Sequence, residues 1–86
     1  MAAKKTFKIG EYCKGGIISV EIQGKIITVI GKEMSGKEFT RGTAESDDPG
    51  VRRKLFMFIS DLTSAYYTDK VIDWIATKVE IPKGFY

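Results

Sequence analysis

The residues of this 86-residue chain that could do chemistry are mainly lysines, arginines and aromatic side chains. The chain contains no histidine, and Cys13 is its one cysteine. It therefore lacks the usual general base, the usual partner of a nucleophile and the commonest metal ligand. Gly24-Lys25 falls in a predicted hairpin with no helix after it, so it does not form a phosphate-binding loop. We predict that the protein is not an enzyme and uses no metal or cofactor.

The basic residues are concentrated in the first half of the chain. Residues 1–43 carry eight Lys or Arg against four Glu, whereas residues 44–86 carry six against seven Asp or Glu. Single-stranded nucleic acid needs cations for its phosphates and flat or apolar surface for its bases. We predict that a set of basic side chains contacts the phosphates and that one tyrosine stacks on a base. The set is Lys8, Tyr12, Lys14, Lys25, Lys32 and Arg41.

Alternating apolar residues predict a sheet over residues 6–44, and helical spacing predicts a helical segment over residues 48–80. The strands are expected at residues 6–13, 17–23, 25–33 and 37–43. Residues 1–5 are expected to be a flexible basic start and residues 81–86 a tail. Asp47 or Asp48 is suited to cap the helix, and residues 67–69 could mark a kink or a break, with Thr68 as a second cap. The chain is therefore predicted to be one α+β domain, with a four-stranded antiparallel meander followed by a long or kinked C-terminal helix (ββββα).

The turn sequences predict how the strands pair. A two-residue Gln23-Gly24 turn would place Val20 opposite Ile27 and Ile18 opposite Val29. A three-residue turn ending at Gly36 would place Phe39 opposite Gly31, with the aromatic ring over the bare glycine.

The two faces of the predicted sheet differ in character. The face that the helix must cover is expected to carry Phe7, Ile9, Ile18, Val20, Ile22, Ile27, Val29 and Phe39. Ile26 and Ile30 are left on the opposite face beside Thr28 and Lys32. Nucleotide bases or a protein partner could contact these two isoleucines, and an ordinary solvated face is the third alternative.

The stretch LFMFI, residues 55–59, is apolar on every side of the predicted helix. A helix that packs on one sheet needs only an apolar stripe, so a second contact is expected. A two-fold partner helix would supply it and predicts a homodimer. The dimer interface would consist of Phe56, Met57, Phe58 and Tyr66. Alternatively, Phe56 and Met57 rest under the first strand or the C-terminal tail. Tyr66, Tyr67 and Trp74 are interpreted as core or interface residues.

The stretch FKIG, residues 7–10, followed by SVEIQGKIITVIGKE, residues 19–33, resembles the single-stranded DNA-binding domain of the positive cofactor 4 family. PUR-alpha repeats and plant Whirly proteins share its order of strands and helix. The resemblance covers residues 6–66. It implies four antiparallel strands, a C-terminal helix through which two copies pair, and binding of single-stranded DNA. The loop after Glu33 is shorter than in that family, the strands carry no tryptophan, and Trp74 lies in an additional helical part.

These observations lead to two functional hypotheses. The first is a small homodimeric protein that binds single-stranded DNA or RNA largely independently of sequence, as a cofactor of transcription or DNA metabolism. The alternative is a protein-interaction or assembly module that does not bind nucleic acid. The lone cysteine, the start without a signal peptide and the lack of a long apolar run predict a cytoplasmic, nucleoid or nuclear protein. No secretion and no membrane partner are expected.

Overall fold

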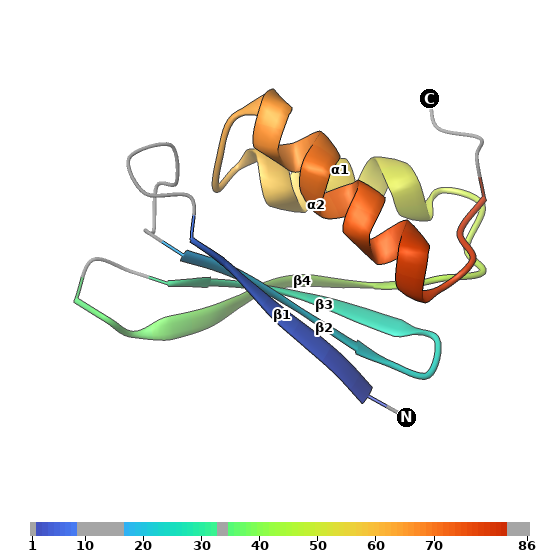
Figure 1. The fold of residues 1–86 in the computed structure, drawn as a ribbon, viewed down its shortest axis with the longest axis horizontal. Helices are drawn as coiled ribbons and strands as arrows, with labels where there is room; N and C mark the ends of the chain where they lie inside the picture. The colour runs from blue at the N-terminus through green and yellow to red at the C-terminus, as the bar shows by residue number, and fades with distance from the viewer. Residues whose placement is uncertain (1, 9–16, 33–34, 83–86) are drawn as a thin grey trace.

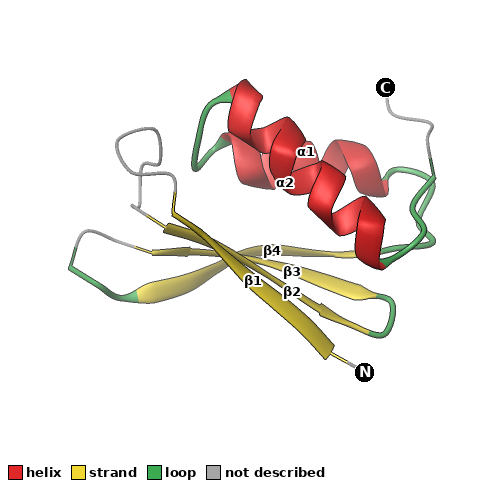
Figure 2. Ribbon diagram, in the orientation of Figure 1, coloured by secondary structure: helices red, strands yellow, loops and turns green. Residues whose placement is uncertain are grey.

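The computed structural model describes residues 2–8, 17–32 and 35–82, and the side chains of residues 2, 7, 8, 17 and 18 are not described. The elements are β1 (Ala2–Lys8), β2 (Ile17–Gln23), β3 (Ile26–Lys32), β4 (Glu38–Glu45), α1 (Val51–Ser60) and α2 (Ala65–Lys78). The strands form one antiparallel sheet in the order β1-β2-β3-β4. Both helices lie on the same face of this sheet, and the other face is left open (Figures 1 and 2). The predicted α+β class, four antiparallel strands followed by C-terminal helical structure, is confirmed.

The first strand begins earlier than the sequence indicated. β1 spans Ala2–Lys8, so the expectation of an irregular start over residues 1–5 is wrong for residues 2–5. Lys4 lies opposite Glu21 and Lys5 opposite Val20 in the pairing with β2. Lysines are common on edge strands, where they hinder further strand pairing. Because Lys4 and Lys5 are charged, residues 2–5 show no alternation of apolar residues that would predict a strand. The rest of the predicted first strand, residues 9–13, lies outside the described residues.

The pairing of β2 with β3 differs by two residues from the expected register. Val20 lies opposite Val29 and Ile22 opposite Ile27. The turn is Gly24-Lys25, and Gly24 has a φ of 61°. A hairpin turn of type II′ requires this positive φ at its first central residue, which places glycine first rather than second in the turn. A shift of two residues leaves each side chain on its predicted face, because strand side chains alternate with a period of two.

The predicted pairing of Gly31 with Phe39 is confirmed. A Cβ atom placed on Gly31 would lie 2.6 Å from Cζ of Phe39, so the ring rests directly on the glycine. Further along β4 the register shifts, because Ile30 pairs with Thr40 whereas Val29 pairs with Gly42. Arg41 is the extra residue of this β-bulge, and bulges commonly redirect a side chain.

The core lies between the sheet and the two helices. It contains Val20, Ile22, Ile27, Val29, Ala44, Val51, Leu55, Ile59, Leu62, Val71, Ile72, Ile75 and Ile81. The first four of these come from the predicted helix-covered face, and Phe39 packs against them half-buried. The side chains of Phe7 and Ile18, and the whole of Ile9, lie outside the description.

The C-terminal helical part consists of two helices rather than one long or kinked helix. The break falls at residues 61–64 and not at residues 67–69. Leu62 in this break is buried, and its Cδ2 would lie 3.1 Å from a Cβ atom on Gly31. Thr68 is fully buried inside α2, where its hydroxyl donates a hydrogen bond to the Ser64 carbonyl over 2.8 Å. The break lets the chain reverse direction so that both helices lie on the sheet.

Asp48 organises the start of α1 and makes it sensitive to pH. Its carboxylate accepts hydrogen bonds from Lys54 Nζ over 2.6 Å and from the Gly50 amide over 2.8 Å. The Lys54 hydrogen bond first, and then that of Gly50, lower the pKa of Asp48 below its ordinary value of 3.8. A carboxyl whose pKa is lowered on folding stabilises the folded state above its unfolded pKa, and this contribution is lost as the pH falls through the folded pKa.

We therefore expect the free energy of unfolding to fall below about pH 4, and to fall less steeply in Asp48→Asn. Urea unfolding followed by circular dichroism across this pH range measures both slopes. Lys54→Gln should flatten the profile in the same direction, because it removes the main cause of the lowered pKa. Parallel profiles for all three proteins would contradict this assignment.

Candidate nucleic-acid interface

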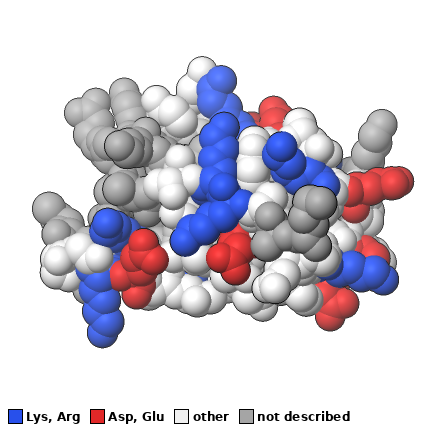
Figure 3. All heavy atoms as spheres, turned by 60° about the horizontal axis from the view of Figure 1, so that its bottom comes forward, with Lys and Arg blue, Asp and Glu red and all other residues white. Residues whose placement is uncertain are grey.

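The open face of the sheet carries charges of both signs. We call it the outer face, and it consists of Lys4, Thr6, Ser19, Glu21, Gln23, Ile26, Thr28, Ile30, Lys32, Glu38, Thr40, Thr43 and Glu45 among the described side chains. Lys4 lies opposite Glu21, and Lys32 lies opposite Glu38. Basic and acidic side chains adjoin one another on this side of the molecule (Figure 3). The outer face is therefore not a continuous positive track for phosphates.

The structure does not gather Lys25, Lys32 and Arg41, the predicted nucleic-acid contacts whose side chains it describes, into one site. Lys32 belongs to the outer face, whereas Lys25 lies in the β2–β3 turn and pairs with Asp47 over 3.1 Å. Tyr12, Lys14 and the side chain of Lys8 lie outside the description.

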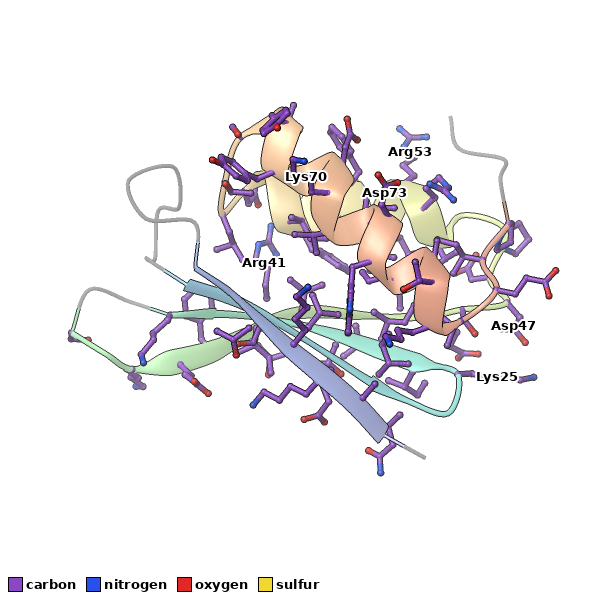
Figure 4. All side chains as sticks on the ribbon, viewed as in Figure 1. Lys25, Arg41, Asp47, Arg53, Lys70 and Asp73 are labelled. Carbon is purple, nitrogen blue, oxygen red and sulfur yellow. The ribbon has the colours of Figure 1, made fainter. Side chains whose placement is uncertain are left out.

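Arg41 does not join the outer face. Its guanidinium binds the Asp61 carboxylate after the end of α1, and it lies 5.6 Å from the ring centroid of Phe58. Figure 4 shows Arg41 between the sheet and the helices. Arg41 is the extra residue of the β-bulge, and its side chain meets α1 beside Gly42.

The residues of the predicted dimer interface are divided between the inside and the outside of the chain. Phe58 packs on β4, where a Cβ atom on Gly42 would lie 2.6 Å from its Cζ. Phe56 is half-buried against the core. Met57 is 56% exposed and Tyr66 is 64% exposed. Phe56 contacts the core and Phe58 contacts β4, so the apolar turn of residues 55–59 does not by itself require a partner helix.

A different group of side chains combines positive charge with aromatic rings. We call it the lysine–aromatic surface, and it consists of Lys5, Tyr66, Tyr67, Lys70, Trp74 and Lys78. The ammonium groups of Lys5 and Lys78 each lie 5.9 Å from the ring centroid of Trp74. Lys70 Nζ lies 4.9 Å from the ring centroid of Tyr66, whose ring meets that of Tyr67 edge to face at 5.1 Å. Three cations therefore lie beside two aromatic rings, and a third ring adjoins one of these.

The periodicity of α2 and the register of β1 create this surface. Tyr67, Lys70, Trp74 and Lys78 follow one another at helical spacing, so they share one side of α2. Thr68, Val71, Ile72 and Ile75 are the buried residues of the same helix and direct it onto the sheet.

Lys5 reaches the lysine–aromatic surface from the edge strand. It lies opposite Val20, which is a core residue, so its side chain projects on the helix side of β1. The neighbouring Lys4 projects to the outer face instead.

Asp69 and Asp73 of α2 border this surface beside Tyr66 and Lys70. At about 100° per residue, Asp69 and Asp73 fall on a different side of α2 from Trp74. The three ion pairs seen in the described part of the chain are Lys25–Asp47, Arg41–Asp61 and Lys54–Asp48. Figure 4 shows Lys70 and Asp73 near one another on α2, away from Lys25 and Asp47. Three carboxylates are therefore paired around β4 and α1, whereas the lysine–aromatic surface combines three lysines with Asp69 and Asp73 at its border.

This arrangement could bind a ligand that combines negative charge with flat aromatic groups, because lysines attract the charge and aromatic side chains stack on the flat groups. A lysine over an exposed ring is stabilised by about 0.5–1 kcal/mol, which is weak enough to be exchanged for another partner. Tyr66, Tyr67 and Trp74 were interpreted from sequence as core or interface residues, and Tyr67 and Trp74 do pack half-buried against the core. The spacing of lysines and rings on α2 was the available signal, whereas the part played by Lys5 required knowledge of β1.

No helix in the described part of the chain is long and apolar enough to cross a membrane. Searches against family models, curated proteins and solved structures find no match to this chain. The resemblance of residues 6–66 to the positive cofactor 4 domain therefore stays a prediction.

Proposed function

We propose that the protein binds single-stranded nucleic acid through the lysine–aromatic surface. The observation that carries the proposal is the position of Lys5 and Lys78, each 5.9 Å from the ring centroid of Trp74. Proteins that bind single strands combine backbone-tracking cations with rings on which bases stack. The proposal moves the binding surface from the outer face, where Glu21, Glu38 and Glu45 would repel phosphates, to the side formed by β1 and α2.

Binding proceeds by exchange of partners at the rings. A base stacked on an aromatic side chain is worth about 1–3 kcal/mol, which exceeds the stabilisation of an exposed lysine by the same ring. A base that approaches Trp74 or Tyr66 displaces the ammonium group, and the lysine then contacts the adjacent phosphate. DNA and RNA strands are bound alike, because the contacts are made to phosphates and base faces.

The proposal is tested by removing two charges from the surface. In Lys5→Gln/Lys78→Gln, we expect the affinity for an oligo-dT strand to fall at least about tenfold at low salt. The slope of log affinity against log salt should shrink by about 1.4, because each phosphate contact on a single strand contributes about 0.7. Fluorescence anisotropy of a labelled oligonucleotide measures both quantities, and circular dichroism verifies that the fold is retained.

The matched control is Lys25→Gln/Lys37→Gln, which has the same net charge but alters exposed residues elsewhere. It should keep most of the affinity and the full salt slope. Equal losses in the two double variants would show that only the net charge matters. No binding of the unmodified protein at about 20 mM salt would overturn the proposal outright.

A further inference from the structure

The middle of the outer face carries five short hydroxyl side chains, Thr6, Ser19, Thr28, Thr40 and Thr43. Across its middle, Thr6, Ser19, Ile30 and Thr40 lie in one row from β1 to β4. The next row consists of Lys4, Glu21, Thr28 and Thr43. Ile26 of the following row is 43% exposed, which makes it one of three large apolar residues exposed in the described chain. Both helices lie on the opposite face, so no described element of the chain covers these rows (Figure 1).

The two edges of this face differ in the sign of their charge, while Glu21 and Lys32 lie on the strands between them. The outward side chains described on β1 are Lys4 and Thr6, and those of β4 are Glu38, Thr40, Thr43 and Glu45. Lys4, Glu38 and Glu45 are all exposed. The face is therefore basic along one edge and acidic along the other.

We infer that this face is the contact surface between two copies of the chain. A two-fold interface must be complementary to itself. An axis parallel to the strands, between β2 and β3, superposes the basic β1 edge of one copy on the acidic β4 edge of the other. Lys4 then faces Thr43 and Glu45 of the second copy, and the distance between adjacent rows, about 7 Å, is within reach of two long side chains. The strands of the two sheets stay aligned, as in most face-to-face packings.

The size of the face sets the strength of this contact. Seven-residue strands and a four-strand width give a footprint of about 23 Å by 19 Å. This is smaller than the roughly 800 Å² that each partner contributes to a standard stable interface. The dimer is therefore expected to dissociate in the micromolar range or above. It leaves the lysine–aromatic surface uncovered, so the inference does not depend on the proposed nucleic-acid binding.

Charge reversal tests this contact directly. Sedimentation velocity over a concentration series should show reversible dimerisation of the unmodified chain, and at least tenfold weaker association for Lys4→Glu and for Glu45→Lys alone. An equimolar mixture of these two variants should associate as well as the unmodified chain or better, because each cross-contact then joins opposite charges. Lys37→Glu, an exposed change outside the outer face, is the control and should associate normally.

Three results would overturn the inference. They are an unmodified chain that stays monomeric to about 0.5 mM, single variants that dimerise like the unmodified chain, and a mixture that associates no better than its components. Restoration in the mixture cannot arise from misfolding, because it requires both variants to be folded.

Discussion

Replacing Leu55 by alanine is expected to lower the free energy of unfolding by about 3–5 kcal/mol. Leu55 is fully buried in the middle of α1, and it is one of the largest such side chains. It belongs to the same buried stripe as Val51 and Ile59, which holds α1 on the sheet. The loss combines the transfer of the missing methyl groups to water with the cavity that they leave. For a domain of 86 residues, whose total stability is of order 10 kcal/mol, this is a large fraction. Urea titration followed by circular dichroism measures it.

Met57→Ala is the matched control for Leu55→Ala. It shortens a neighbouring apolar side chain on the same helix, with a similar change in helix propensity. Because Met57 is 56% exposed, its truncation should change the free energy of unfolding by about 0.5 kcal/mol or less. Equal losses for the two variants would contradict the placement of α1. A loss at Met57 that grows with protein concentration would instead support the predicted role of this residue in a helix-mediated dimer.

Replacing Gly42 by alanine is expected to cost about 1–3 kcal/mol, although the change adds only one methyl group. Its Cβ atom would lie 2.6 Å from Cζ and 2.7 Å from two other ring carbons of Phe58. The ring cannot move away freely, because Arg41 lies over it and is itself bound to Asp61. The substitution must therefore displace α1 from β4 or disrupt this stack. Thermal and urea unfolding of the variant give the cost.

A double-mutant cycle with Phe58→Leu identifies the cause. In the background of this smaller side chain, Gly42→Ala should cost at least about 1 kcal/mol less, because the clash is with the ring. Gly50→Ala is the control, since its Cβ atom would meet only Asp48 Oδ1 at an ordinary distance of 3.6 Å. Additive effects of Gly42→Ala and Phe58→Leu would contradict the close packing of α1 on β4.

The parts of the fold that depend on alternation could be predicted from the sequence. Val20, Ile22, Ile27 and Val29 were assigned to the buried face, and they lie there although the β2–β3 register differs by two residues. An even shift preserves the faces, so the period of two was informative even where the turn was misplaced. The register itself depended on which residue of the turn takes a positive φ.

The features that depend on tertiary packing could not be predicted in this way. The β-bulge at Arg41 has no signature in the alternating pattern, yet it shifts the register of β4 against β3. The break at residues 61–64 is marked by no glycine or proline. Its position is linked to Leu62, which packs beside Gly31 of β3.

The residue types of the candidate site could be predicted from the sequence, but their position could not. The chemistry of lysines with aromatic rings was foreseen, but it was assigned to the outer face. Lys5 and Trp74 are separated by 69 positions in the chain, and only the early start of β1 brings them together. A charged edge strand carries little apolar signal, so the contact of Lys5 with α2 could not be foreseen.

The fluorescence of Trp74 tests nucleic-acid binding most directly, because it is the only tryptophan of the chain and lies within the proposed surface. Titration of the unmodified protein with oligo-dT at low salt should quench or shift its emission in a saturable manner, and the change should be reversed by about 0.5 M salt. Lys5→Gln/Lys78→Gln should require a higher oligonucleotide concentration for the same change. Emission that stays constant while anisotropy reports binding would place the nucleic acid elsewhere on the molecule, and no change in either signal would contradict nucleic-acid binding altogether.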